Sequence, residues 1–223
     1  MQIKENCIIL RHFSSSDCKV AALTQTMGKI ILVALNDRQI QRMHNGSVVT
    51  ATLVHKHQAL YRATDLEIVS TPLPTIPDDI YWLHHLLELS YFFLPLHDQA
   101  TKHFFILSSC LIFIRNHIHH YDGWHSLKFF CIAMFLMHIG FNPPEHLERS
   151  LRTFSDTLFS FIDFDEKQKI ECLSSQLENF PSIFLSELKT WLITCIQSHP
   201  RIQMFKTLGF MYQSSLPRIQ KSS

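Results

Sequence analysis

Glycine is scarce in this chain, with 5 glycines among 223 residues. Phosphate-binding loops of nucleotide-using enzymes need closely spaced glycines, so this scarcity argues against such a loop and against the use of ATP. The sequence also has no GxSxG motif and no cysteine in a recognisable signature for nucleophilic catalysis. It therefore offers no motif for phosphoryl-transfer or hydrolytic chemistry.

Paired cysteines and long apolar runs are missing as well. The 6 cysteines are scattered, and no two have the CxxC spacing that presents two thiolates to zinc. The longest uncharged apolar stretches, 104–114 and 129–139, are shorter than the roughly 20 residues that a membrane-spanning helix needs. No signal peptide is visible at the N-terminus. We expect a soluble, cytoplasmic protein with buried thiols and no structural zinc.

The charge is nearly balanced overall but unevenly placed. The formal net charge is +1, from 20 Lys+Arg and 19 Asp+Glu. Residues 1–71 hold 8 of these cations and 5 of these anions, a balance of +3, which leaves 12 against 14, a balance of −2, for the rest. A polyanion would therefore prefer the N-terminal third of the chain.

Short runs rich in Val, Ile, Leu and Thr fill the first seventy residues. Five of these runs are bounded by polar turns, and Gly28 stands where one turn must reverse the chain before the buried-type run GKIILVAL. Five strands in about seventy residues suit a small barrel. Between the third and fourth runs, the polar stretch NDRQIQRMHNG predicts a loop or a short helix.

The spacing of the apolar residues changes from strand-like to helical after a proline-rich stretch. Pro72, Pro74 and Pro77 predict an extended linker at 72–77, with Asp78 or Asp79 as the N-cap of the next helix. From there the apolar residues recur at helical spacing, and Gly140 is placed to end one helix. The remaining sequence predicts an all-α domain of about six helices over 78–223.

Cations near the predicted turns and strand ends of the β region are the candidate binding residues. They are Lys29, Arg38, Arg42, Lys56 and Arg62. Tyr61 lies among them, with His44 and His57 nearby, and a groove that combines cations with stacking rings is how small barrels hold single strands. The alternative is that these cations form an ordinary solvated surface.

Histidines cluster in the helical half at His117, His119, His120 and His125. His117 and His120 are three residues apart and suit one helical face, which is compatible with a shared metal ion. No HExxH motif accompanies them. The cluster fits a polar helix C-terminus better, so a metal-dependent enzyme is the weaker interpretation.

Six segments carry a resemblance to a known family: NCIILRHF, SSSDCKVAALTQTMGKIILVAL, the basic connector DRQIQR and LYRATDLEIV in the N-terminal third, and more weakly HSLKFFCIAMFLMHIGFNPP and HPRIQMFKTLGFM. Their order resembles that of the RecO family of bacterial recombination mediators. Two features depart from the family. The four-cysteine zinc knuckle is missing after GFNPP, and the connector is less basic than usual.

The resemblance implies an α+β multidomain protein: a five-stranded OB-fold β-barrel at 1–71, the linker at 72–77 and a helical domain at 78–223. It implies a non-enzymatic DNA repair mediator without a cofactor. Such a protein binds single- and double-stranded DNA, promotes annealing, and works with RecR to replace single-strand binding protein by RecA.

The resemblance also implies that the helical domain takes up the C-terminal tail of single-strand binding protein. Lys102, Arg115 and Lys128 are the candidate residues for that contact. A rival interpretation is a diverged adaptor that docks RecR or single-strand binding protein without significant DNA binding. The near-neutral charge and the thinned connector favour this rival.

Overall fold

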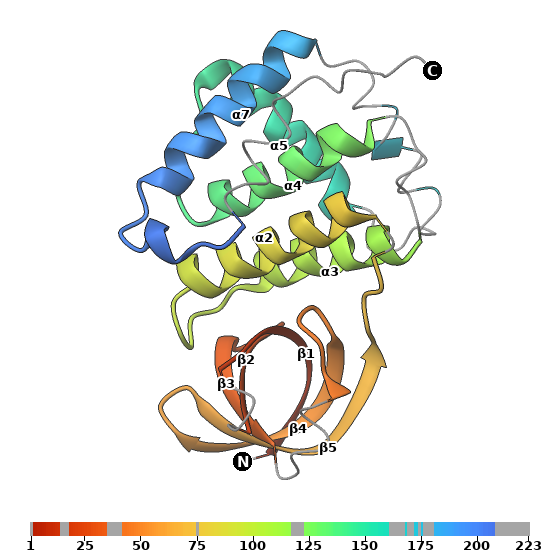
Figure 1. Ribbon diagram of the computed structural model, residues 1–223, viewed down its shortest axis with the longest axis vertical. Coiled ribbons are helices and arrows are strands. Elements are labelled where there is room, and N and C mark those ends of the chain that lie inside the picture. Colours follow the sequence, from red (N-terminus) through yellow and green to blue (C-terminus); the bar gives the residue numbers. More distant parts are fainter. Residues whose placement is uncertain are drawn as a thin grey trace.

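The chain folds into a β half followed by an α half, which stack one above the other in Figure 1. The computed structural model describes residues 2–13, 18–34, 42–74, 76–116, 123–160, 168, 172–173, 175 and 181–207. The α+β class predicted from the sequence is confirmed. No helix in these ranges has the length and apolar character needed to cross a membrane.

Five strands make up the β half: β1 (Gln2–His12), β2 (Lys19–Thr24), β3 (Gly28–Ala34), β4 (Val48–His57) and β5 (Leu60–Ser70). They form a closed, mixed sheet in the order β1-β2-β3-β5-β4, and β1 pairs with β4 to complete the ring. β3 and β5 are parallel, whereas the other neighbours are antiparallel. Each predicted run corresponds to one strand.

Alternation along the strands separates the barrel interior from its outer face. The side chains that point inward form an apolar cluster that includes Ile9 of β1, Leu32 of β3 and Leu53 of β4. Their neighbours in sequence point outward. This period of two residues decides which of the candidate cations can face solvent.

Gly28 confirms the predicted turn between β2 and β3. It has φ +70°, and the hydroxyl of Thr24 donates to its carbonyl oxygen at 3.0 Å. A Cβ atom at this position would lie 1.6 Å from the main-chain oxygen of Asp98. Glycine is therefore required both by the backbone conformation and by the close approach of the loop that contains Asp98.

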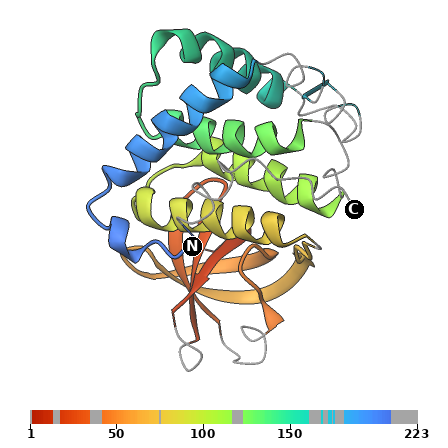
Figure 2. The same ribbon diagram turned by 45° about the horizontal axis from the view of Figure 1, so that its top comes forward.

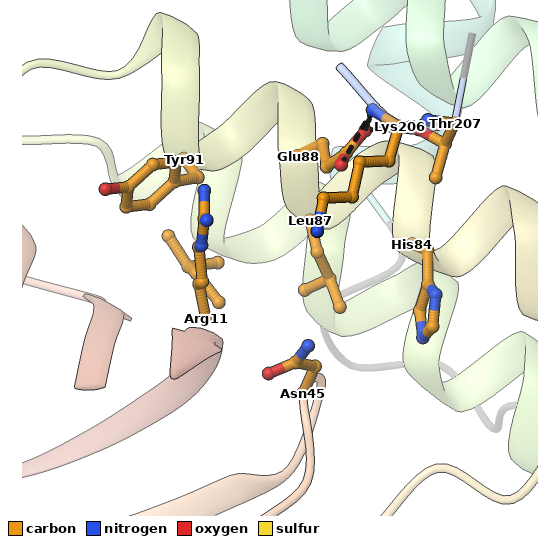
Figure 3. A pocket seen from close by; sticks show the side chains of 9 residues that line it. Arg11, Asn45, His84, Leu87, Glu88, Tyr91, Lys206 and Thr207 are labelled. Atoms are coloured by element: carbon orange, nitrogen blue, oxygen red, sulfur yellow. Dashed lines mark hydrogen bonds between the residues drawn. The ribbon is translucent and has the colours of Figure 1, made fainter. Parts of the chain in front are cut away.

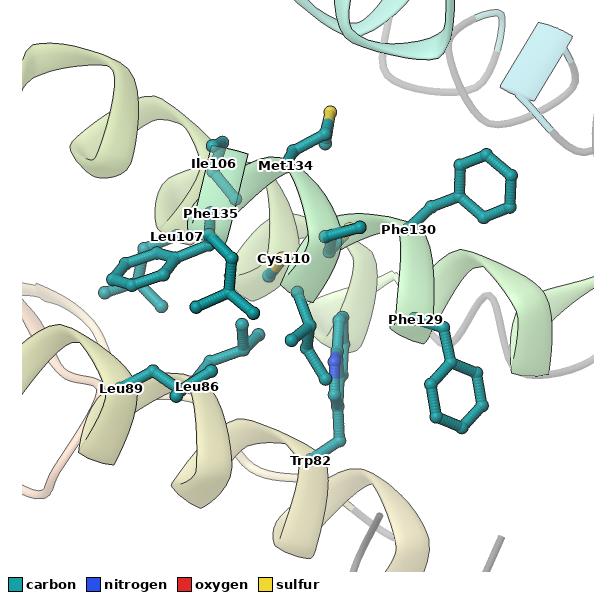
Figure 4. Close-up of a cluster of buried hydrophobic side chains, with 14 of the residues drawn as sticks. Trp82, Leu86, Leu89, Ile106, Leu107, Cys110, Phe129, Phe130, Met134 and Phe135 are labelled. Carbon is teal, nitrogen blue, oxygen red and sulfur yellow. The ribbon is translucent and has the colours of Figure 1, made fainter. Parts of the chain in front are cut away.

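Five longer helices follow in the described part of the chain: α2 (Pro77–Phe93), α3 (Thr101–Arg115), α4 (Trp124–His138), α5 (Glu145–Ser160) and α7 (Ser182–Gln197). A short 3-10 helix, η3 (Ile202–Met204), comes after them. Figure 4 shows how side chains of α2, α3 and α4, among them Trp82, Cys110 and Phe135, meet in the helical core. Residues 166–178 also have apolar residues at helical spacing, which predicts one of the six helices, but this segment lies largely outside the described residues.

The ends of two helices test the predicted caps. The N-cap of α2 is Ile76, without a side-chain hydrogen bond, so the prediction of Asp78 or Asp79 was wrong. Pro77 occupies the first turn because it needs no backbone donor there, and this moves both aspartates into the helix. Gly140, with φ +99°, follows α4 and confirms the predicted end of that helix.

Apolar packing joins the two halves. Helix α2 contacts β1 and helix α3 contacts β2. The outward-facing side chains Ile8, Leu10, Ala21 and Leu23 belong to the same buried cluster as the helical core. The helices lie over one end of the barrel (Figure 2) and cover the outer face there, including Ile31 of β3, whereas Lys4 of β1, Lys19 of β2 and Arg62 of β5 stay exposed.

The predicted boundaries coincide with the change in secondary structure. β5 ends at Ser70 and α2 begins at Pro77, so the linker predicted at 72–77 falls almost wholly between them. The shared apolar cluster means that the halves are not separated by solvent. Their status as two domains, 1–71 and 78–223, stays a prediction.

Candidate nucleic-acid interface

Lys29 does not face solvent, contrary to its role as a candidate phosphate contact. Its side chain is buried at the junction between β3 and α2, where Nζ donates to the main-chain oxygen of Tyr91 at 2.6 Å. The ammonium also lies 5.3 Å from the centre of the Tyr91 ring. Burial, helped by the charge of Arg201, lowers the pKa of Lys29 to about 8. Lys29 is a structural residue because α2 covers this end of the barrel.

Tyr61 is also withdrawn from the surface. Alternation places its ring on the inner face of β5, within the apolar cluster of the barrel. Its hydroxyl lies 2.6 Å from Nε2 of His97, and the two rings are stacked with centroids 6.0 Å apart. The ring cannot stack on a base in this position, so the predicted role of Tyr61 was wrong.

Three of the four remaining candidate cations of the β half are exposed in the structure. Arg42, Lys56 and Arg62 are exposed, as a contact with phosphate requires. Arg38 lies outside the described residues. Of the predicted set, Lys56 and Arg62 belong to the same hairpin of β4 and β5.

Strand register places two further exposed cations, Lys19 and Lys4, on the same outer face of the barrel as Arg62. Lys19 of β2 is opposite Val33 of β3, and Val33 is opposite Arg62 of β5. Directly opposed residues point to the same side of a sheet, so Lys19 and Arg62 share one row, about 10 Å apart across two strand spacings. Val54 of β4 and Gln2 of β1 continue that row around the barrel.

The neighbouring row adds Lys4 to the face. Lys4 is opposite Thr52 of β4, which is opposite Thr64 of β5, and all three side chains are at least partly exposed. We call the surface formed by Lys4, Lys19, Lys56 and Arg62 the open barrel face. Lys4 and Lys19 were missed in the sequence, although their alternation with the inward residues Ile3 and Val20 would have placed them outside.

Carboxylates limit this surface on one side. Glu67 of β5 is exposed and stands opposite Thr50, beyond the rows that hold the cations. Asp65, also exposed, has φ +48° and marks an irregularity in the same strand. Glu5 faces inward, where it accepts a hydrogen bond from the Thr26 hydroxyl at 2.5 Å. A polyanion would therefore lie toward the hairpin of β4 and β5.

Among the candidates in the helical half, Lys128 is the clearest mismatch. Its Nζ forms an ion pair with Asp79 Oδ1 at 2.5 Å, and both side chains are buried. The indole nitrogen of Trp124 donates to the same carboxylate oxygen at 3.0 Å. This pair holds α4 against the first turn of α2, so Lys128 is not available to a partner. Lys102 and Arg115, at opposite ends of α3, are exposed.

The histidine cluster falls mostly outside the described residues, which exclude His117, His119 and His120. His125 is exposed at the start of α4, where its Nε2 lies 3.5 Å from Nζ of Lys189. Within the described ranges, no three His, Cys, Asp or Glu side chains come together as metal ligands would.

Neither a protein-family model nor a curated protein sequence matches this chain. The assignment of function therefore rests on the residues and their arrangement.

Proposed function

We propose that this chain is a RecO-like, non-enzymatic mediator of DNA repair and recombination whose β half is an OB-fold that binds single-stranded DNA. The supporting observation is the open barrel face, where four exposed cations lie on a closed five-stranded sheet of order β1-β2-β3-β5-β4. An OB-fold is a five-stranded barrel that presents oligonucleotide-binding surfaces. Double-stranded DNA is a second ligand of the same surface.

The mechanism is electrostatic. Lys19 and Arg62 hold phosphates along one row, Lys4 and Lys56 extend the contact, and released counterions drive binding. Arg38 and Arg42 in the connector supply further contacts in this proposal. The described residues of the open barrel face include no exposed Phe, Tyr or Trp. Binding therefore depends on the backbone of the nucleic acid more than on base stacking, and it tolerates any sequence.

A double variant tests the site. Replacing Lys19 and Arg62 together by Gln removes two phosphate contacts and leaves the inner face of the barrel unchanged. For a single strand, each contact contributes about 0.7 to the slope of log affinity against log salt, so the slope should fall by about 1.4. Fluorescence anisotropy of a labelled oligonucleotide measures this quantity.

A matched control carries the same change in charge. Arg149 and Arg152 lie on α5, exposed and outside the barrel, and their joint replacement by Gln should leave the slope unchanged. Equal losses in the two double variants would mean that net charge, rather than the open barrel face, governs binding. Affinity that is unchanged by Lys19→Gln and Arg62→Gln would remove this face from the interface.

The proposed partners follow the same assignment. RecR and the tail of single-strand binding protein dock on the chain, and RecA is loaded indirectly, in a cytoplasmic, nucleoid-associated complex. Lys102 and Arg115 remain candidates for the tail, whereas Lys128 is withdrawn because it is paired inside the core. Pull-down with purified partners, with nuclease present, tests these contacts without DNA.

An adaptor without significant DNA binding is the second candidate. Apolar side chains are exposed where β5 leads into α2, with Val69 at 59%, Leu73 at 74% and Tyr81 at 53% exposure. Such side chains suit a protein partner better than a polyanion. Undiminished capture of RecR by a chain that fails to bind DNA at low salt would favour this candidate.

A further inference from the structure

A cavity lies at the seam between the two halves, where three segments of the chain meet (Figure 3). Its volume is about 170 Å³. Arg11 comes from β1, Asn45 from the turn before β4, His84 and Tyr91 from α2, and Lys206 from the segment after η3. We call this cavity the seam pocket.

Nitrogen donors surround the seam pocket. Arg11 has its guanidinium 5.1 Å from the centre of the Tyr91 ring, which holds that cation at the wall. The side chains of Lys206 and Asn45 extend toward the space between them in Figure 3, and the His84 ring closes the far side. Two permanent cations and two polar side chains thus line a small volume.

The nearby carboxylate is already engaged. Glu88 accepts hydrogen bonds from the main-chain nitrogen of Lys206 at 3.0 Å and of Thr207 at 3.1 Å, and from the Thr207 hydroxyl at 2.6 Å. The Glu88 carboxylate is therefore hydrogen-bonded to the backbone at residues 206 and 207 rather than to the Arg11 or Lys206 side chain. Among the described residues, neither Arg11 nor Lys206 has an ion pair with a carboxylate. Two cations and one carboxylate line the pocket, so its walls keep a net positive charge.

We propose that the seam pocket binds a single phosphate group. Drug-sized ligands occupy pockets of about 300–1,000 Å³, so a volume of about 170 Å³ suits one phosphate and excludes a nucleoside. Arg11 offers the planar fork that matches two phosphate oxygens, and Lys206 adds a point charge. Asn45 and His84 donate to the remaining oxygens. The phosphate is either free in solution or the terminal phosphate of a nucleic acid.

A bound phosphate would link three parts of the fold. Arg11 belongs to the barrel, His84 to α2, and Lys206 to the segment that Glu88 holds in place. Because the ligand binds only the folded arrangement, it should raise the thermal midpoint of unfolding. This inference does not depend on DNA binding by the open barrel face.

Calorimetric titration with inorganic phosphate, at constant ionic strength set by chloride, is the test. Wild-type protein should bind phosphate, and Lys206→Gln should weaken binding at least about tenfold, or about 1.4 kcal/mol. The main-chain bond from residue 206 to Glu88 is kept in this variant, and Lys206→Arg should restore binding. Arg149→Gln, on α5, is the matched control and should bind like wild type.

Two oligonucleotides of one sequence, with and without a 5′-phosphate, separate the two sources. A preference for the phosphorylated strand that is lost in Lys206→Gln identifies the terminal phosphate of a nucleic acid. Phosphate binding without such a preference identifies the free ion. The proposal is overturned if wild type shows no heat of binding, or if Lys206→Gln and Arg149→Gln bind phosphate equally well. Because the calorimetric arm contains no DNA, its failure is distinguishable from failure of the proposed function.

Discussion

Lys29 Nζ donates a hydrogen bond to the main-chain oxygen of Tyr91 at 2.6 Å, and this bond joins the start of β3 to the last turn of α2. The main-chain oxygen of Lys29 accepts a second bond from the nitrogen of His97 at 2.8 Å. Lys29 looks like a surface cation in the sequence, but in the structure it joins the β half to the α half through these two hydrogen bonds.

The buried ammonium of Lys29 should make stability depend on pH. Its pKa is lowered from 10.5 to about 8 in the folded protein, so the unfolded chain binds more protons between these values. The free energy of unfolding attributable to Lys29 therefore rises with pH across this window. Urea unfolding at pH about 7.5 and about 9.5 should show wild type gaining roughly 2 kcal/mol relative to Lys29→Met. Parallel pH curves for the two proteins would contradict this assignment.

The ion pair between Asp79 and Lys128 should be costly to break from one side. Lys128→Met leaves a buried carboxylate without its cation, and we expect a loss of about 3 kcal/mol in the free energy of unfolding. Adding Asp79→Asn should recover part of that loss. Arg152→Met breaks the exposed pair with Glu148 and should cost less than about 1 kcal/mol. A similar cost for the buried and exposed pairs would refute the structural role of Lys128.

Glu88 should hold the C-terminal segment against α2. Thr207 gives its hydroxyl hydrogen to Glu88, so Nδ1 of His85, 3.0 Å away, is the donor in the bond to that hydroxyl. Glu88→Gln keeps the shape of the side chain but removes the charge that strengthens these bonds. Amide hydrogen exchange at residues 206 and 207 should become roughly tenfold faster, a change of about 1.4 kcal/mol in local opening. Glu187→Gln, which affects only the exposed contact with His146, is the control and should leave the exchange rates at residues 206 and 207 unchanged.

The connector cations Arg38 and Arg42 form a separate test. If both touch phosphate, their joint replacement by Ala should weaken binding uniformly across sequences and lower the salt slope by about 2 for double-stranded DNA and by about 1.4 for a single strand. The salt series that tests Lys19 and Arg62 also serves here. An unchanged slope would remove both arginines from the interface.

Alternation predicted the strands well but did not decide which outward face would stay open. The five runs matched β1 to β5 because β-branched residues and polar turns mark strands locally. Lys29 is correctly placed at the β2–β3 hairpin, yet it is buried because α2 crosses that end of the barrel. Contacts between segments 62 residues apart, as between Lys29 and Tyr91, leave no local signal in the sequence.

The errors at Tyr61 and Lys19 have a simpler origin. Ala63 and Tyr61 alternate with Arg62, so the inward position of the tyrosine follows from the period of two residues once Arg62 is placed outside. Lys19 precedes the inward Val20 in the same way. Its position in a row with Arg62 depends on the register of β2, β3 and β5, and the parallel pairing of β3 with β5 cannot be read from one strand at a time.

The central claim is that the open barrel face holds a single strand by its phosphates. The most direct measurement is anisotropy of a labelled single-stranded oligonucleotide with wild-type protein across a salt series. Six proposed contacts, at Lys4, Lys19, Lys56 and Arg62 on the barrel and at Arg38 and Arg42 in the connector, predict a linear fall of log affinity against log salt with a slope of about −4. Absence of binding at low salt, or binding that salt does not weaken, would contradict the claim.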